Sequence, residues 1–332
     1  MSVGGRRRSA RAVGATAAPG GAGRGERGGR TASAPRPAPP EVAGVRITHP
    51  DRIVYPDHGV TKLDLARFYE AIADRILPHL RGRPTTLVRC PEGLSQACFY
   101  QRHAGSWAPA TLRRVRIREK TKVAECLVVD DLPGLIGLVQ MGIVEIHTWN
   151  SRVDQLEQPD RIVLDLDPDP AVSGADLVAG TRLVRDALAA AGLESFVKTT
   201  GGKGYHVVVP LVPGAGWEEC AGFARRLAET LAAREPARFV ATMARAARRG
   251  KIFIDYLRNA RGATSVTPYS TRARPGAPVS TPVAWEELGP RLTPGRYTVA
   301  TLPRRLATLR ADPWAAYSRV RQRLPPASAV AR

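Results

Sequence analysis

Two aspartates stand at the end of an apolar stretch, in the segment IVLDLDPDP (162–170). Side chains alternate between the two faces of an extended strand, so Asp165 and Asp167 point the same way and Leu166 points to the other face. Neighbouring carboxylates repel each other unless a cation lies between them, and Mg²⁺ and Mn²⁺ prefer oxygen ligands. The pair therefore predicts a metal-binding platform, although a solvated strand end with Asp-Pro turns is the plainer interpretation of an isolated Asp-x-Asp.

A third carboxylate, Asp255, follows another apolar stretch in KIFIDYLRN (251–259). If this strand lies beside the first one, the three carboxylates could hold two divalent ions about 4 Å apart, an arrangement that activates a hydroxyl nucleophile and stabilises a departing phosphate. We therefore predict that Asp165, Asp167 and Asp255 are catalytic and bind two divalent metal ions.

A glycine-rich turn lies between the two acidic strands, in KTTGGKGYHVVVP (198–210). Its glycines, Gly201 among them, would let backbone amides approach phosphate oxygens closely, while Thr200 and Lys203 supply a hydroxyl and a positive charge beside His206. The segment is not a Walker A loop, because G-x-x-x-x-G-K-[ST] is absent. A β-hairpin turn with an exposed lysine fits the pattern equally well.

Two further segments, VEIHTWNSR and TPYSTRARP, carry polar side chains that could line a nucleotide site. The first places His147 on a strand, and the second places Ser270 and Arg272 in a loop after a proline, where the arginine could clamp a triphosphate. A core histidine and a surface arginine in an arginine-rich chain remain open as the plainer interpretation.

The elements around these residues predict an α+β protein with two modules. The order of strands and helices after residue 156 is β-α-β-β-α-β-like, which suits a ferredoxin-like or RNA-recognition-like palm. The expected helices span 61–80, 132–141, 175–191, 217–233, 237–248 and 313–323, and the expected strands span 85–89, 97–101, 115–118, 125–129, 144–149, 161–166, 196–199, 206–210 and 252–256.

Composition points to a polyanionic partner. The chain has 332 residues, a formal net charge of +20 and a pI near 10.8, and nucleic acid is the leading candidate because each neutralised phosphate releases counterions. An arginine-rich proteome is the alternative explanation. Residues 1–42 contain Arg, Gly, Ala and Pro with few large apolar side chains, which predicts a disordered basic tail that holds DNA nonspecifically, serves as a spacer or reflects a misassigned start codon.

The remaining composition predicts a cytoplasmic, nucleoid-associated protein without a membrane anchor. No apolar run approaches the roughly 20 residues that span a bilayer. Four cysteines, Cys90, Cys98, Cys126 and Cys220, occur without a C-x-x-C pair or ligand-spaced histidines, so we expect free thiols and no zinc site.

Taken together, eight segments resemble the polymerase domain of bacterial ATP-dependent DNA ligase D, a member of the archaeo-eukaryotic primase superfamily. Their order and spacing agree with that family over nearly all of the chain after residue 42. The segments are THPDRIVYP (48–56), TKLDLARFYEAIADRILPHLRGRP, QACFYQRH, VEIHTWNSR, RIVLDLDPDP, KTTGGKGYHV, IFIDYLRN and PYSTRARPGAPVSTPVAW.

The resemblance implies a primase-polymerase fold over residues 43–325, with a mixed α/β N-terminal module (about 43–155) packed on an RNA-recognition-like palm with flanking helices (about 156–325). It also implies a role for each matching position. Asp165, Asp167 and Asp255 would bind the metals, His147, Thr200, Gly201, Lys203, His206, Ser270 and Arg272 would form the nucleotide site, His49, Arg52 and Lys62 would bind a 5′-phosphate of DNA, and Phe99 and Tyr100 would stack on the template.

Three departures from the family pattern bear on these roles. Thr200 stands where Ser is usual, and Arg258 follows Asp255 where Gln is common. In the 5′-phosphate pocket, His49 and Arg52 replace Asn and Lys, so a phosphate contact is retained at the arginine and becomes pH-dependent at the histidine.

The sequence therefore predicts a template-dependent nucleotidyl transferase, a DNA repair polymerase or primase that adds nucleotides at DNA ends and short gaps in non-homologous end joining or gap repair. The resemblance also implies a preference for Mn²⁺ over Mg²⁺ and ribonucleoside triphosphates as substrates. Because no K-x-D-G ligase motif is present, we expect a stand-alone polymerase domain whose partners are a gapped or broken duplex with a 5′-phosphate, Ku and a separate DNA ligase. A catalytically weak end-binding module and a metal-dependent phosphohydrolase or nuclease remain as alternatives.

Overall fold

The computed structural model describes residues 38–109, 112–119 and 121–329. Pro39 and the residues after it form one compact unit, whereas most of the predicted basic tail lies outside the described residues. A short hairpin, β1 (Glu41–Val42) with β2 (Val45–Arg46), is the first regular element among the described residues and begins just before residue 43, the predicted start of the domain.

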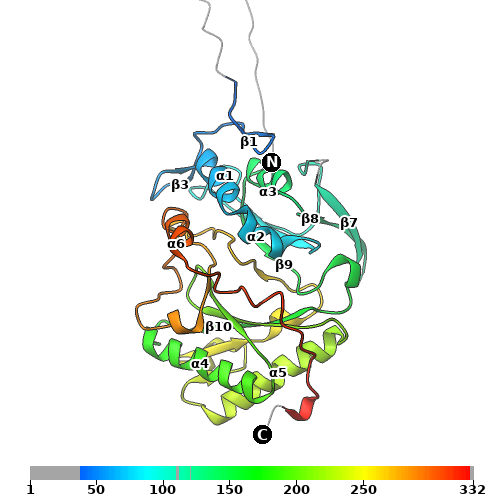
Figure 1. The fold of residues 1–332 in the computed structure, drawn as a ribbon, viewed down its shortest axis with the longest axis vertical. Coiled ribbons are helices and arrows are strands. Elements are labelled where there is room, and N and C mark those ends of the chain that lie inside the picture. Colours follow the sequence, from blue (N-terminus) through cyan, green and yellow to red (C-terminus); the bar gives the residue numbers. More distant parts are fainter. Residues whose placement is uncertain (1–37, 110–111, 120, 330–332) are drawn as a thin grey trace, which may run out of the picture. The chain divides into compact units, whose positions relative to one another are not determined.

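The N-terminal module is a sheet covered by helices (Figure 1). The four strands follow the order β15-β9-β5-β6, and α1, α2 and α3 pack on them around a single apolar core. Thr61 caps α1 through a capping box with Asp64. The single helix expected over 61–80 is instead two helices, because Ile72 leaves the helical conformation (φ −113°, ψ 14°).

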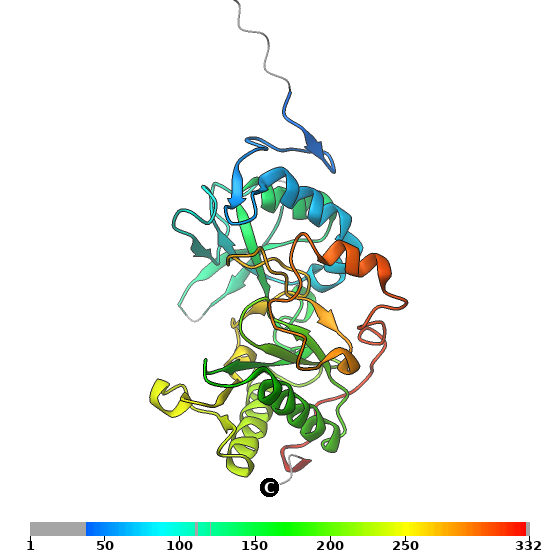
Figure 2. The same ribbon diagram turned by 90° about the vertical axis from the view of Figure 1, so that its left-hand side faces the viewer.

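The palm is a six-stranded sheet with the order β13-β14-β10-β12-β11-β16. Its four central strands are antiparallel and have the 4-1-3-2 order of a ferredoxin-like sheet, which confirms the predicted palm. Helices α4 and α5 lie against one face, as Figures 1 and 2 show, and bury Leu164, Leu166 and Val207 of that face. The opposite face, which carries Asp165 and Asp167, is therefore free to line a site.

The segment after residue 264 joins the two modules. β15 pairs with β9 of the N-terminal sheet, and β16 pairs with β11 of the palm. Between them, Tyr269 and Val279 enter the N-terminal core, while Val283 enters the palm core. Each module is thus completed by residues that are distant in the sequence.

Two predicted helices are wrong. The segment 237–248 forms the short strand β13 and a 3₁₀ turn, because the apolar pair Phe239 and Val240 adds to the sheet edge beside β14. The segment 313–323 is not helical either. Trp314 stacks on Tyr317 and donates from its indole nitrogen to the carbonyl of Val197, so these aromatic side chains bind the C-terminal segment to the sheet as a series of turns.

The bounds of all regular elements among the described residues are as follows. The helices are α1 Lys62–Ala71, α2 Ala73–Leu80, α3 Leu132–Gln140, α4 Gly174–Ala190, α5 Trp217–Arg234 and α6 Leu302–Thr308, with 3₁₀ turns η1 Val153–Gln155, η2 Arg245–Arg248, η3 Leu257–Asn259, η4 Trp285–Glu287 and η5 Ala327–Ala329. The strands are β1 Glu41–Val42, β2 Val45–Arg46, β3 Ile53–Tyr55, β4 Val60–Thr61, β5 Thr85–Arg89, β6 Phe99–Gln101, β7 Arg113–Arg118, β8 Val123–Val128, β9 Ile143–Thr148, β10 Arg161–Pro168, β11 Phe196–Thr199, β12 Tyr205–Pro210, β13 Phe239–Val240, β14 Ile252–Asp255, β15 Ser265–Val266 and β16 Pro282–Val283. None of the helices described here is long and apolar enough to cross a membrane.

Candidate active site

A row of polar side chains crosses the palm sheet. Asp165 on β10 is directly opposite Asp255 on β14 and His206 on β12, and His206 is in turn opposite Lys198 on β11. Residues directly opposite each other in a sheet share a face, so all four side chains point away from α4 and α5. Asp167 lies two residues further along the same face. The register thus brings the three predicted carboxylates together.

The carboxylates already have a positively charged partner. Arg258 Nε lies 3.3 Å from Asp165 Oδ2 and 3.1 Å from Asp255 Oδ2. The backbone amide of Leu257 donates to the other oxygen of Asp255, and His206 Nε2 lies 3.3 Å from Asp165 Oδ1. Arg258 was noted from the sequence only as a departure from the family pattern, and the structure places it between two predicted metal ligands.

The buried charges affect one another strongly. Burial alone would raise the pKa of Asp165, but His206 and Arg258 hold it well below its ordinary value. Burial raises the pKa values of Asp167 and Asp255, and the negative charge of Asp165 contributes to both increases. Burial and the nearby Lys198 lower the pKa of His206 to about 4, so its imidazole is neutral at pH 7. The site therefore concentrates negative charge on aspartates that strongly favour a cation.

The glycine-rich turn is closed by its own backbone and hydroxyl group. Thr200 Oγ1 donates to the carbonyl of Gly204 at 2.8 Å and accepts from the amide of Gly202 at 3.1 Å. A Cβ atom on Gly204 would lie 1.8 Å from the carbonyl oxygen of Leu166, so only glycine fits there. The turn leaves Lys203 exposed beside the carboxylates, where it can meet a phosphate.

Glu145 holds two of the predicted nucleotide-site residues in place. Its Oε1 lies 2.6 Å from His147 Nε2 and 2.9 Å from Arg272 Nε, and its Oε2 accepts from the amide of Ala273. Burial would raise the pKa of Glu145, but His147 and Arg272 lower it to about 2, so the carboxylate is ionised. Arg272 also donates to the carbonyl of Thr200 at 2.5 Å, which connects this group to the glycine-rich turn.

These groups surround one cavity of about 230 Å³. Of the residues predicted to bind metal or nucleotide, Asp255, Gly201 and Ser270 do not line it. Ser270 is fully buried, where its hydroxyl accepts from the amide of Ile146 and donates to the carbonyl of Thr271, so it supports the site from behind. The lining residues are Tyr100, His147, Asp165, Asp167, Thr200, Gly202, Lys203, His206, Arg258, Thr264, Ser265, Val266, Arg272 and Arg274.

A second basic cavity, of about 280 Å³, brings together the three residues predicted to bind a 5′-phosphate. His49, Arg52 and Lys62 line it. Lys62 donates from Nζ to the carbonyl of Thr48, and Arg52 pairs with Glu92 at 3.0 Å. Burial, with the charge of Arg52, lowers the pKa of Lys62 to about 8.

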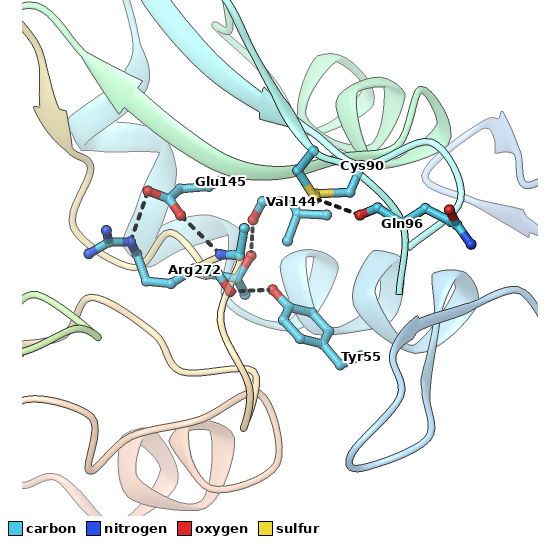
Figure 3. The surroundings of a disulfide bond; sticks show 9 residues. Tyr55, Cys90, Gln96, Val144, Glu145 and Arg272 are labelled. Carbon is cyan, nitrogen blue, oxygen red and sulfur yellow. Dashed lines mark hydrogen bonds and ion pairs between the residues drawn. A yellow bond between two sulfur atoms is a disulfide. The ribbon is translucent and has the colours of Figure 1, made fainter. Parts of the chain in front are cut away.

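The prediction of four free thiols is wrong for Cys90 and Cys98, which form a disulfide (Figure 3). The turn after β5 folds back to the start of β6 and places their Cα atoms 4.4 Å apart, a proximity that the spacing of eight residues does not reveal. Cys126 and Cys220 are free and buried. Figure 3 shows the disulfide close to the group formed by Glu145 and Arg272.

The two aromatic residues predicted to stack on the template follow the disulfide directly. Tyr100 is 71% exposed and lines the 230 Å³ cavity, with its ring 6.3 Å from that of His147. Phe99 is 44% exposed and lies near the guanidinium of Arg89. The exposed ring of Tyr100 beside the cavity suits stacking against a base.

Sequence reasoning missed Glu145 and Lys198. Glu145 lies two residues before His147 on the same strand, so alternation could have placed both on one face. Lys198 is buried, donates from Nζ to Ser280 Oγ at 2.6 Å, and has a pKa far below its ordinary value through burial and the charge of Arg272. Lys198 opens the segment KTTGGKGYHVVVP, but its place beside His206 depends on the strand register, which the segment does not reveal.

The donor set fits a hard divalent cation. Asp165, Asp167 and Asp255 offer oxygen ligands only, which suits Mg²⁺ or Mn²⁺, and the guanidinium of Arg258 stands in for a cation between two of them. As the described side chains lie, no three His, Cys, Asp or Glu residues form a group that could hold a metal ion.

The ferredoxin-like palm, its row of carboxylates and the adjoining basic turn define a nucleotidyl transferase of the primase-polymerase class. The chain belongs to the LigD primase-polymerase domain family, whose model matches residues 61–314. It is 44% identical over 299 residues, 90% of its length, to the multifunctional non-homologous end joining protein LigD of Pseudomonas aeruginosa, and 33% identical over 254 residues, 74% of its length, to the LigD DNA repair protein of Mycobacterium tuberculosis.

The fold agrees with a solved structure of the same family. The polymerase domain of Mycobacterium tuberculosis ligase D, in complex with DNA, matches with a TM-score of 0.76 and 32% identity over 79% of this chain and 94% of that one. The chain spans 36% of the length of the Pseudomonas relative and 33% of the mycobacterial one.

Proposed function

We propose that this protein extends the 3′ end of a DNA primer, directed by a template, at short gaps and broken ends. The observation that carries the proposal is the row of three carboxylates on one sheet face, directly beside the basic turn with Lys203. Family membership supports nucleotidyl transfer as the reaction and repair of breaks by end joining as its setting.

Divalent ions, with Mn²⁺ preferred over Mg²⁺, would be held by Asp165, Asp167 and Asp255 and would supply acidification of the 3′-hydroxyl and stabilisation of the developing charge. The chain's own contribution is positioning. Lys203 and Arg272 would bind the triphosphate. The neutral imidazoles of His147 and His206 would form hydrogen bonds without adding a positive charge that repels the metal ions. We further propose ribonucleoside triphosphates as the preferred substrates.

The second basic cavity would bind the 5′-phosphate of the downstream strand. His49, Arg52 and Lys62 line it, while Tyr100 lies at the edge of the first cavity, where a template base would stack, with the exposed Phe99 beside it in the chain. Binding the 5′-phosphate on the downstream side of a gap would place the 3′ end of the primer at the three aspartates. Ku and a separate DNA ligase are the proposed partners at the nucleoid, since end joining also needs end binding and sealing.

The direct test is extension of a 5′-labelled primer on a gapped duplex with a downstream 5′-phosphate, with Mn²⁺ and each nucleotide in turn. Wild type is expected to add template-directed nucleotides, and the double variant Asp165→Ala, Asp167→Ala is expected to add none. Shortening of the labelled strand would indicate a nuclease instead. Tight binding of the gap by both proteins without extension would favour an end-binding module.

A further inference from the structure

Arg258 occupies the place that a divalent ion would take between two carboxylates. Its Nε is within 3.3 Å of an oxygen of Asp165 and an oxygen of Asp255, on neighbouring strands. The other oxygen of each carboxylate is already engaged, by His206 and by the amide of Leu257. Arg258 therefore contacts, on each carboxylate, the oxygen that His206 or Leu257 does not use.

The backbone beneath Arg258 is fixed, but its side chain has room to move. Asn259, the next residue, exchanges two 2.8 Å hydrogen bonds with the backbone of Val163 and donates to the carbonyl of Tyr256, which anchors the turn η3 to β10. The side chain of Arg258 is 41% exposed and lines the 230 Å³ cavity. It can thus leave the carboxylates without any change of fold.

Arg258 cannot make way for a metal ion by losing a proton, because its guanidinium stays charged at every accessible pH. If the guanidinium remained beside the aspartates, its repulsion would weaken binding of a divalent ion. If it withdraws, it enters a cavity whose lining already includes the cations Lys203 and Arg272. An anionic triphosphate in that cavity would compensate for all three charges.

We propose that Arg258 is a built-in counter-cation that competes with the divalent metal for Asp165 and Asp255 and is drawn away when a nucleotide triphosphate enters the cavity. The inference rests on the proposed function. Its consequence is that metal and nucleotide bind cooperatively: the free protein holds metal weakly, and the nucleotide removes the competitor. A neutral glutamine at this position would supply no competing charge.

The test is titration of the full, metal-free chain with Mn²⁺ in the absence of nucleotide and DNA, followed through the electron paramagnetic resonance signal of the free ion. Arg258→Gln is expected to raise Mn²⁺ affinity on the order of tenfold, within the usual range of coupling between two ligands. In the presence of a non-hydrolysable nucleoside triphosphate, the difference in Mn²⁺ affinity between wild type and Arg258→Gln should become smaller. The matched control is Arg261→Gln, three residues further on, where the arginine pairs with the exposed Glu157 and not with the aspartates.

Equal Mn²⁺ affinities for wild type and Arg258→Gln, or a weaker affinity for the variant, would overturn the inference. The double variant Asp165→Ala, Asp167→Ala separates this result from failure of the proposed function. If that variant binds Mn²⁺ as wild type does, the metal site itself is misplaced. If it loses Mn²⁺ while wild type and Arg258→Gln bind equally, the site stands and only the role of Arg258 fails. Thermal unfolding of each metal-free variant establishes that it is folded.

Discussion

At the scale of single residues, Glu145 controls the nucleotide site without needing to touch a nucleotide. Its carboxylate is buried and contacts His147, Arg272 and the amide of Ala273 at once. Removing one partner of a buried ion pair leaves an uncompensated charge, which is more costly than losing a surface pair. Glu145 is therefore a positioning residue for the two cavity residues on either side of it.

We predict that Glu145→Ala lowers the free energy of unfolding by about 3–5 kcal/mol, because Arg272 and His147 lose a buried partner. Glu145→Gln keeps the shape and is expected to fold, but to raise the KM for nucleotide severalfold while changing kcat less, since Arg272 is less well oriented. Urea unfolding and steady-state primer extension measure the two effects. Glu157→Gln is the matched control, because its exposed pair with Arg261 contributes less than about 1 kcal/mol. An unchanged KM in Glu145→Gln would contradict the positioning role.

Lys62 gives the second basic cavity a pH dependence. Burial and Arg52 lower its pKa from 10.5 to about 8, and His49, Arg89 and Glu92 line the same cavity. The unfolded chain therefore binds more protons than the folded one between about pH 8 and pH 10.5, so folding gains stability as pH rises through that window. Phosphate binding is expected to weaken as pH rises through the same window, because it needs the charged amine of Lys62.

We predict that the preference for a 5′-phosphate over a 5′-hydroxyl end weakens as pH rises above about 8, where Lys62 loses its proton. Lys62→Arg keeps its charge and should hold the preference up to pH 10. Fluorescence anisotropy with matched phosphorylated and unphosphorylated gapped duplexes measures this preference for wild type and for Lys62→Arg at each pH. Identical pH profiles for wild type and Lys62→Arg would show that Lys62 does not bind the phosphate.

At the scale of elements, the sequence predicted what depends on local alternation. The apolar and acidic alternation in β10 placed Asp165 and Asp167 on one face, and the β-α-β-β-α-β order predicted the ferredoxin-like palm. The prediction from the sequence failed where tertiary contacts determine the local structure. Phe239 and Val240 form an edge strand only because β14 offers a partner, and the Cys90–Cys98 disulfide depends on how the turn after β5 closes. The pairing of Arg258 with two aspartates likewise needs the strand register.

The disulfide ties the end of β5 to the start of β6 and so fixes the segment between the two cavities. The carbonyl of Pro91 and the carboxylate of Glu92, both in this segment, accept hydrogen bonds from Arg52. Tyr100 of the first cavity follows Cys98 by two residues. A single covalent link therefore restrains parts of both binding sites.

We predict that Cys98→Ser lowers the free energy of unfolding by about 2–3 kcal/mol, the loop-entropy contribution of a short closed loop. Dithiothreitol should shift the urea midpoint of wild type toward that of the variant and leave the variant unchanged, because Cys126 and Cys220 are already free. Cys220→Ser is the control for loss of a thiol that forms no disulfide. A reductant-insensitive wild type would show that Cys90 and Cys98 are not bonded in solution.

At the scale of the whole molecule, charge and architecture make separate contributions to DNA binding. Residues 1–38 carry eight arginines and one glutamate of a chain whose net charge is +20. The two basic cavities, in contrast, are formed entirely within the compact unit that begins at Pro39. General attraction to phosphates depends on the number of cations, whereas recognition of a 5′-phosphate depends on the placement of a few of them.

We therefore predict that a chain beginning at Pro39 binds gapped DNA less tightly than the full chain and with a shallower dependence on salt. Each phosphate that the shortened chain no longer neutralises should reduce the slope of log K against log salt by about 0.9 on duplex DNA. The ratio of affinities for phosphorylated and unphosphorylated gaps should stay the same, because His49, Arg52 and Lys62 are retained. Anisotropy titrations over a series of salt concentrations measure slope and ratio together. If the shortened chain keeps the full salt dependence of binding, the first 38 residues do not bind phosphates. If it loses the preference for phosphorylated over unphosphorylated gaps, those residues contribute to recognition of the 5′-phosphate, and the cavity around Lys62 is not sufficient for it.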